Sequence, residues 1–133
     1  MPHLGSCLCG SVKITITSNI TKQLACHCSD CNKTSGTAFS SNIFPKVSEI
    51  EITGDTHEYS SIGLTRIFCP GCGSAIGHKT INFGDRMAIQ TGNFPDLRDI
   101  PFDQEIFVNV RWAGIPQIPD TEQSVRLPPS YLA

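Results

Sequence analysis

The seven cysteines of this sequence fall into three tight groups. They are Cys7-x-Cys9, Cys26-x-Cys28-x-x-Cys31 and Cys69-x-x-Cys72. A disulfide joins facing segments whose Cα atoms lie about 5.5 to 6 Å apart, whereas closely spaced cysteines let several sulfurs reach one ion. The spacing therefore predicts metal ligands, and thiolates in such local groups are typical of zinc.

The segment Cys69-Pro70-Gly71-Cys72-Gly73 is typical of a zinc knuckle, a tight turn in which glycine tolerates unusual backbone angles. One knuckle supplies two thiolates, and a closed structural site needs four. Cys7 and Cys9 are the natural second pair, provided that the chain bends between them. We therefore expect Cys7, Cys9, Cys69 and Cys72 to hold one structural zinc ion, closing a loop of about 60 residues and stabilising the fold.

The remaining cysteines form a compact triplet, Cys26, Cys28 and Cys31. Three protein ligands with an exchangeable fourth position are the pattern of a catalytic zinc site, whereas four protein ligands are the pattern of a structural one. No cysteine is left for the fourth position, so we expect it to be open. The alternative is that a histidine closes it, the candidates being His3, His27, His57 and His78.

Three thiolate ligands also restrict the class of reaction that the site can catalyse. They donate strongly to the metal, so its power to acidify water falls below that of a three-histidine site. Such a site suits the capture of a substrate thiol, held as a thiolate close to a carbonyl or a comparable electrophile. The chemistry indicated is the making or breaking of a carbon–sulfur bond.

The elements that must position these cysteines are strands, so the predicted fold class is mainly β. Val12, Ile14 and Ile16 alternate with polar residues, as in a half-buried strand. Further strands are expected at 37–44, 48–53, 64–68, 86–91 and 105–110. A short helical turn is expected after Cys28, capped by Ser29 or Asp30 and ended by Gly36. From Pro95 onward, recurring prolines predict an irregular tail that wraps the sheet.

Length and composition restrict the function. The 133 residues, 39% of them hydrophobic, fit one domain spanning 1–133. A net charge of −2 gives no excess of Lys and Arg for phosphate backbones, which argues against nucleic acid as a partner. No apolar run approaches the roughly 20 residues of a membrane span, and the first residues do not form a signal peptide. We therefore expect a cytoplasmic protein.

The ordered motifs resemble those of the glutathione-dependent formaldehyde-activating enzyme family, which includes centromere-protein-V-like proteins. The motifs are Gly5-x-Cys7-x-Cys9-Gly10, then Cys26-His27-Cys28-x-x-Cys31 followed by Thr34-Ser35-Gly36 and Phe39, then Cys69-x-x-Cys72-Gly73. The later segment EIFVNVRWAGIPQIPD is similar to the family's tryptophan-containing tail.

The resemblance implies a zinc-binding β-tent fold with the same division of the cysteines into a structural and a catalytic zinc site. It also implies carbon–sulfur lyase chemistry, with glutathione as a possible co-substrate and S-hydroxymethylglutathione as the founding product. The alternatives are a non-catalytic zinc domain that binds a protein partner, and a family member recruited to a biosynthetic pathway with a larger substrate.

Polar residues after the triplet are the candidates for substrate binding. They are Asp30, Lys33, Thr34, Ser35 and Ser40. Many family members have basic residues directly after the third cysteine of the triplet, and here the pair is Asn32-Lys33. His27 is a candidate for tuning the metal or moving protons, and equally for a structural role.

Overall fold

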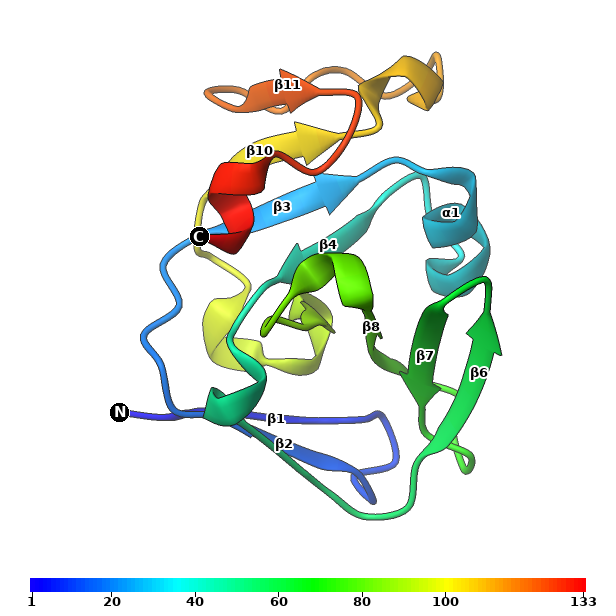
Figure 1. The fold of residues 1–133 in the computed structure, drawn as a ribbon, viewed down its shortest axis with the longest axis vertical. Helices are drawn as coiled ribbons and strands as arrows, with labels where there is room; N and C mark the ends of the chain where they lie inside the picture. The colour runs from blue at the N-terminus through cyan, green and yellow to red at the C-terminus, as the bar shows by residue number, and fades with distance from the viewer.

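The computed structural model describes residues 1–133 and confirms a mainly β fold built from two sheets. The smaller sheet is antiparallel and has the order β1-β2-β5. Its strands are β1 (His3–Ser6), β2 (Lys13–Ile16) and β5 (Ile50–Thr53). In Figure 1 this sheet lies at the bottom of the molecule, next to the amino terminus.

The larger sheet has eight strands in the order β11-β10-β3-β4-β9-β8-β7-β6. Strand β10 runs parallel to both of its neighbours, and the other pairs are antiparallel. Figure 1 shows β3, β10 and β11 stacked at the top and β6 to β8 turned toward the right. The strands are β3 (Gln23–Cys26), β4 (Ser40–Ile43), β6 (His57–Ser61), β7 (Leu64–Phe68), β8 (Ala75–Thr80), β9 (Ala88–Gln90), β10 (Phe102–Ile106) and β11 (Glu122–Ser124).

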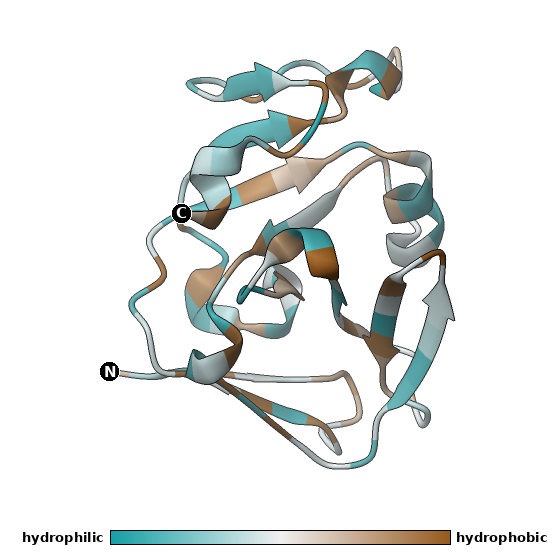
Figure 2. Cartoon of the chain, viewed as in Figure 1, coloured by the Kyte–Doolittle hydropathy of each residue, from teal (hydrophilic) through white to brown (hydrophobic).

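The main core joins the smaller sheet to the larger one. The side chains of Val12, Ile14 and Ile16 are at most 1% exposed, as their alternation predicts, and pack in one cluster with Ile76 and Phe94. A second cluster, around Leu24, Phe44 and Tyr131, lies against β3 and β10 and also contains Cys26 and Cys31. Polar residues dominate the edge strands β6 and β11 (Figure 2).

One α-helix, α1 (Ser29–Ser35), follows the second cysteine of the triplet. It ends at Gly36, as predicted, because Gly36 adopts a left-handed conformation with φ of 69° and donates its backbone N–H to Asn32 O. The predicted cap at Ser29 or Asp30 is wrong. The N-cap is Cys28, whose Sγ accepts the backbone N–H of Cys31 at 3.2 Å. No helix is both long and apolar enough to cross a membrane.

Short 3-10 helices form most of the remaining regular structure. They span Val47–Glu49, Ile81–Phe83, Thr91–Asn93, Pro95–Leu97, Val108–Val110 and Pro129–Leu132. The strand predicted at 105–110 therefore ends at Ile106, where Phe107 takes a left-handed conformation with φ of 56°. The strand predicted at 37–44 is confined to Ser40–Ile43, and that at 86–91 to Ala88–Gln90. The tail after Pro95 is irregular as predicted, but β10 and β11 also extend the larger sheet.

Candidate functional site

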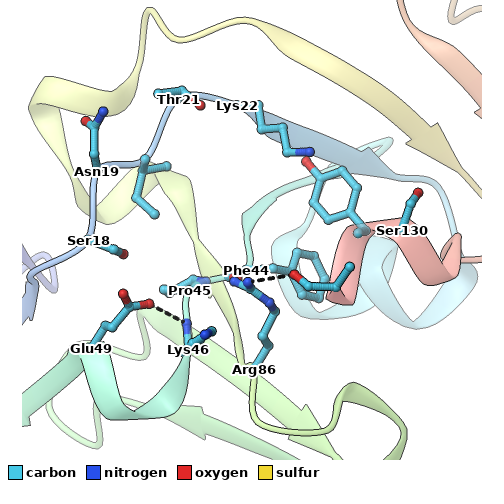
Figure 3. Close-up of a pocket in the computed structure, with 13 residues that line it drawn as sticks. Ser18, Asn19, Thr21, Lys22, Phe44, Pro45, Lys46, Glu49, Arg86 and Ser130 are labelled. Carbon is cyan, nitrogen blue, oxygen red and sulfur yellow. Dashed lines mark hydrogen bonds between the residues drawn. The ribbon is translucent and has the colours of Figure 1, made fainter.

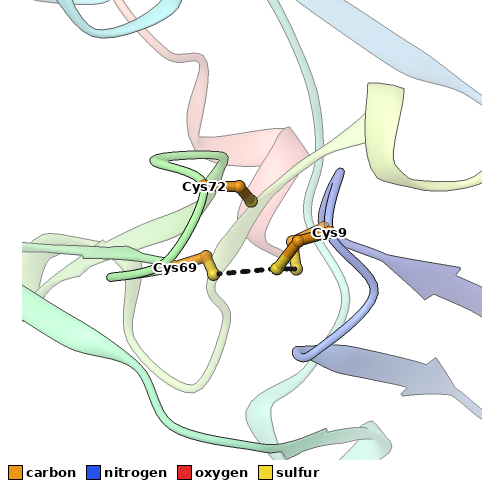
Figure 4. Close-up of side chains that lie close together, drawn as sticks. Cys9, Cys69 and Cys72 are labelled. Carbon is orange, nitrogen blue, oxygen red and sulfur yellow. Dashed lines mark hydrogen bonds between the residues drawn. The ribbon is translucent and has the colours of Figure 1, made fainter.

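A group of four cysteines brings together segments 60 residues apart in sequence (Figure 4). The Sγ atoms of Cys7 and Cys9 lie 3.6 Å apart, and those of Cys9 and Cys69 lie 3.8 Å apart. All four sulfurs, including that of Cys72, lie within 4.8 Å of one another. Tetrahedral zinc with bonds of about 2.3 Å separates its sulfurs by about 3.8 Å, so these residues fit such an ion.

Two turns shape this four-cysteine group. In the first, Cys7 N–H donates to Val12 O at 3.1 Å and Gly10 N–H donates to Cys7 O at 3.1 Å, which folds the Cys-x-Cys pair back on itself. In the second, Gly73 N–H donates to Cys69 O at 2.8 Å, and Gly73 has a φ of 77° that favours glycine. The bend expected between Cys7 and Cys9 is thus present.

Hydrogen bonds favour the thiolate form of Cys72 and Cys7. In Cys9, hydrogen bonds with Ser11 lower the pKa, but the neighbouring Cys7 and Cys69 outweigh them and raise it. The Ser74 hydroxyl, 3.2 Å from Cys72 Sγ, acts with backbone N–H groups to lower the pKa of Cys72 to about 5. Burial raises the pKa of Cys7, but the Val12 N–H and neighbouring side chains outweigh it and lower the pKa to about 7. Groups that stabilise thiolates also suit metal binding, because the metal ligand is the deprotonated sulfur.

The triplet lies where β3 passes into α1. Cys26 is the last residue of β3, Cys28 is the helix N-cap and Cys31 lies in the first turn of the helix. The Sγ atoms of Cys26 and Cys31 are 3.2 Å apart, and the three sulfurs lie within 4.8 Å of one another. Hydrogen bonds from the side chains of Cys26 and Cys31, with backbone N–H groups, hold the pKa of Cys28 far below its usual value.

The group contains three cysteines and no histidine or carboxylate. Three converging sulfurs fit one face of a thiolate-bound metal ion and leave a position free for another ligand. Burial differs within the triplet, since Cys26 and Cys31 are at most 5% exposed and Cys28 is only partly buried. Of the histidines considered as a fourth ligand, His78 lines the same cavity as the triplet, but it does not belong to the group of ligand atoms that lie within 4.8 Å of one another.

His27 does not join the triplet although it lies between two of its members. Its ring is fully buried, and Nε2 lies 2.7 Å from Glu105 Oε1 on β10. Its backbone N–H donates to Ile106 O at 3.1 Å, and its ring packs against Phe39 with centroids 5.3 Å apart. These contacts attach the Cys26–Cys28 segment to the tail.

One face of the larger sheet and the triplet together line a cavity of about 320 Å³, which we call the inner pocket. Residues paired across neighbouring strands point to the same face, and the register pairs Cys26 with Ile106, Leu24 with Asn42 and His78 with Arg66. The lining includes Leu24, Cys26, Asn42, Arg66, His78 and Ile106 from this face, together with Cys28 and Cys31.

Two polar residues of the inner pocket, Asn42 and Arg66, were not predicted from the sequence, and a third, His78, was predicted only as a candidate fourth ligand of the triplet. Asn42 is 2% exposed, and its Oδ1 has no hydrogen-bond partner. Arg66 belongs to none of the ion pairs of the structure, and its only side-chain partner is Thr34 Oγ1 at 3.4 Å. Burial and the charge of Arg66 lower the pKa of His78 to about 4, so His78 is neutral at pH 7. Leu64 and Arg66 lie two residues apart in the strand predicted at 64–68 and therefore on one face of it, which was the one available signal for Arg66.

The predicted substrate-binding residues are divided by the structure. Asp30 lines the inner pocket, and with Lys33 and Thr34 it also lines an adjoining depression of about 310 Å³, here called the outer cleft. Arg66, Leu64 and Tyr59 lie on its other side. Ser35 lies in neither, because its hydroxyl donates to Cys31 O at 2.6 Å.

Ser40 also lies outside both depressions, although it contacts residues of the site. Its buried Oγ accepts a hydrogen bond from Asn42 Nδ2 at 2.8 Å. Cys26 lowers the pKa of Cys31, but Cys28 and burial outweigh it and raise the pKa to about 11, and the Ser40 hydroxyl partly opposes this rise.

A separate depression of about 290 Å³ lies on the other side of Phe44 and contains no cysteine (Figure 3). It holds Lys22, Lys46 and Arg86. The Arg86 guanidinium is engaged by backbone oxygens, since NH1 donates to Phe44 O at 2.6 Å and NH2 to Ala133 O at 3.0 Å. Lys22 lies 3.5 Å from an Asp103 carboxylate oxygen and 4.6 Å from the centre of the Tyr131 ring. These contacts attach the carboxyl-terminal segment to the sheet.

Comparison with known proteins identifies the family. The model of the family described as glutathione-dependent formaldehyde-activating enzyme matches residues 2–110, which contain both cysteine groups. The chain belongs to this family. Membership associates it with glutathione-dependent chemistry of aldehydes.

The fold has a solved counterpart. A crystal structure of a Rhodobacter sphaeroides protein superposes with a TM-score of 0.56 at 17% identity, covering 74% of this chain and 98% of that one. At this identity the likeness concerns the fold alone. No curated protein matches the sequence at a significant level.

Proposed function

We propose that this protein is a zinc-dependent carbon–sulfur lyase that acts on the adduct of a glutathione-like thiol and an aldehyde. The observation that carries the proposal is the position of the triplet: three sulfurs converge at the edge of a cavity, and no histidine or carboxylate belongs to their group. Cys7, Cys9, Cys69 and Cys72 would hold a structural zinc ion, and Cys26, Cys28 and Cys31 the zinc ion of the reaction.

Zinc bound at the triplet would supply a soft positive centre that favours the thiolate form of a substrate thiol. The chain's own residues contribute position and polarity. The unpaired Asn42 Oδ1 is an acceptor for the hydroxyl group that such an adduct carries. His78 offers one donor and one acceptor without a charge, because its pKa of about 4 keeps the ring neutral.

The residues of the outer cleft favour the binding of a thiol that carries carboxylates. Lys33 and Arg66 both line it, and Arg66 is not engaged by any carboxylate of the protein. Glutathione carries two carboxylates, and a guanidinium binds a carboxylate through two parallel hydrogen bonds. Arg66 also borders the inner pocket, so a thiol held in the cleft would lie beside the triplet.

Metal content and turnover test the proposal together. The protein loaded with zinc should hold two ions per chain and speed the formation or breakdown of S-hydroxymethylglutathione. Cys28→Ser should remove one ion and the activity while leaving the fold intact, since the four-cysteine group is untouched. Ser29→Ala, an exposed neighbour, is the matched control and should keep both ions. Turnover that survives in Cys28→Ser would contradict the proposal, as would a triplet ion already saturated by four protein ligands.

A further inference from the structure

The wall of the inner pocket is mostly hydrocarbon. Apart from the three cysteines of the triplet, seven of its thirteen lining residues are hydrophobic, and beyond the sheet they include Phe83, Phe107 and Leu127. Phe83 is held in place by edge-to-face packing on Phe44, with ring centroids 5.3 Å apart at 83°. Leu127 lies beyond residue 110, where the match to the family model ends. Part of this wall is thus built by a segment outside the matched region.

The size of the inner pocket exceeds what formaldehyde needs. A volume of about 320 Å³ corresponds to roughly ten water molecules at about 30 Å³ each, and formaldehyde has two heavy atoms, carbon and oxygen. Glutathione does not match the wall either, because its carboxylates and ammonium group require polar partners. The cationic partners for those carboxylates are Lys33 in the outer cleft and Arg66, which borders both the cleft and the inner pocket. The apolar volume beside the triplet is therefore left for the other half of the adduct.

We infer that the aldehyde half of the substrate carries a hydrocarbon group, aromatic or branched, that packs against Phe83, Phe107 and Leu127. The inference rests on the proposed function and specifies its substrate class. In the synthetic direction the thiol sulfur bonds to the aldehyde carbon, the carbonyl π bond breaks, and the thiol proton ends on the oxygen as a hydroxyl. The reverse step restores both reactants, and no oxidant or reductant is needed.

Binding of two unreactive thioethers tests the inference without turnover. S-benzylglutathione and S-methylglutathione differ only in the hydrocarbon on sulfur, and calorimetry on the zinc-loaded protein gives both dissociation constants. One methylene in a hydrophobic pocket is worth about 10- to 200-fold, so S-benzylglutathione should bind at least about tenfold more tightly. Leu127→Ala should reduce that ratio severalfold. Val125→Ala, in the same segment but outside the pocket, is the control and should leave both constants unchanged.

Turnover gives a second measurement. With glutathione as the thiol, kcat/KM for phenylacetaldehyde should exceed that for formaldehyde at least about tenfold. Equal binding of the two thioethers together with a preference for formaldehyde would overturn the inference and leave the proposed function standing. Failure to bind either thioether or to convert any aldehyde would overturn both. The two thioethers and the two aldehydes are also compared on the unmodified protein, so the inference is tested even if Leu127→Ala does not fold.

Discussion

The buried carboxylate of Glu105 is expected to be the main attachment between the tail and the triplet segment, and Glu105→Ala tests this. Its side chain is fully buried, with Oε1 2.7 Å from His27 Nε2. The other oxygen, Oε2, accepts hydrogen bonds from four donors in the tail at 2.8 to 3.3 Å: Arg111, Ile118 N–H, Thr121 and Gln123. No other side chain of the protein joins these two segments in this way.

The magnitude follows from what the substitution leaves behind. Glu105→Ala deprives Arg111 of its carboxylate and leaves the His27 ring and several tail donors without their acceptor. Removing one partner of a buried ion pair costs about 3 to 5 kcal/mol, and each abandoned buried donor costs about 1 to 3 kcal/mol. Some tail donors regain water, so we expect the free energy of unfolding to fall by about 3 to 5 kcal/mol.

Urea unfolding of the metal-loaded protein measures this change. Glu122→Ala removes an exposed carboxylate from the neighbouring strand β11 and is the matched control, with an expected effect within about 0.5 kcal/mol. Hydrogen exchange should show that the opening begins in the tail, at residues 111–123, because that segment loses four of the contacts. A loss of less than about 1 kcal/mol in Glu105→Ala would show that the carboxylate does not hold the tail.

Three further predictions follow from single residues. Burial raises the pKa of Glu105, but hydrogen bonds from Gln123, His27 and Ile118 N–H and the charge of Arg111 outweigh it and lower the pKa to about 2. The contribution of Glu105 to stability is therefore complete above about pH 4.5 and disappears as the pH falls toward 2. The difference in unfolding free energy between the unmodified protein and Glu105→Gln should shrink over that range; a difference independent of pH would contradict this. Gly5→Ala should destabilise by about 1 to 3 kcal/mol, because a Cβ would lie 2.7 Å from the Phe94 ring, whereas Gly92→Ala meets nothing within 4 Å; equal melting temperatures would contradict it. Cys69→Ser should lose the fold as well as an ion, because metal binding there closes the long loop, and circular dichroism with metal analysis would expose a folded variant as a contradiction.

The metal-binding groups could be predicted from the sequence because their spacing is local. Within each group at most two residues separate neighbouring cysteines, so the chain has few ways of keeping their sulfurs apart. The pairing of Cys7 and Cys9 with Cys69 and Cys72 was predicted by the need for four ligands, and the structure places these four sulfurs together. The alternating strand at 12–17 was equally readable, because one of its faces is buried and the other is not.

The strands that were missed lack that alternation. Strand β3 has the sequence QLAC and is buried at every position, so it shows no period of two. Strand β8 contains Gly77, which the neighbouring strand requires, since a Cβ there would lie 2.3 Å from Ala88 O. With β3 and β8 unassigned, nothing in the sequence could place His78 beside Arg66 or Cys26 beside Ile106. The inner pocket depends on this long-range register.

The burial of Glu105 could not be predicted from the sequence either. In the predicted strand 105–110 it would be read as a solvent-facing polar residue, whereas its side chain is fully buried. Its burial is possible only because His27 and the tail supply enough donors, and those donors lie up to 78 residues away in sequence. The left-handed conformation of Phe107 directly after the strand is likewise set by tertiary packing, since a bulky residue rarely adopts it alone.

Cobalt substitution tests most directly whether the triplet holds a metal ion with a position open to a substrate thiol. Cobalt replaces zinc in thiolate sites and reports the number of bound sulfurs through its sulfur-to-metal charge-transfer absorption. In the cobalt-loaded protein, glutathione should increase that absorption at one ion of the two, and Cys28→Ser should abolish the increase. A spectrum that glutathione leaves unchanged in the fully loaded protein would contradict an open position at the triplet.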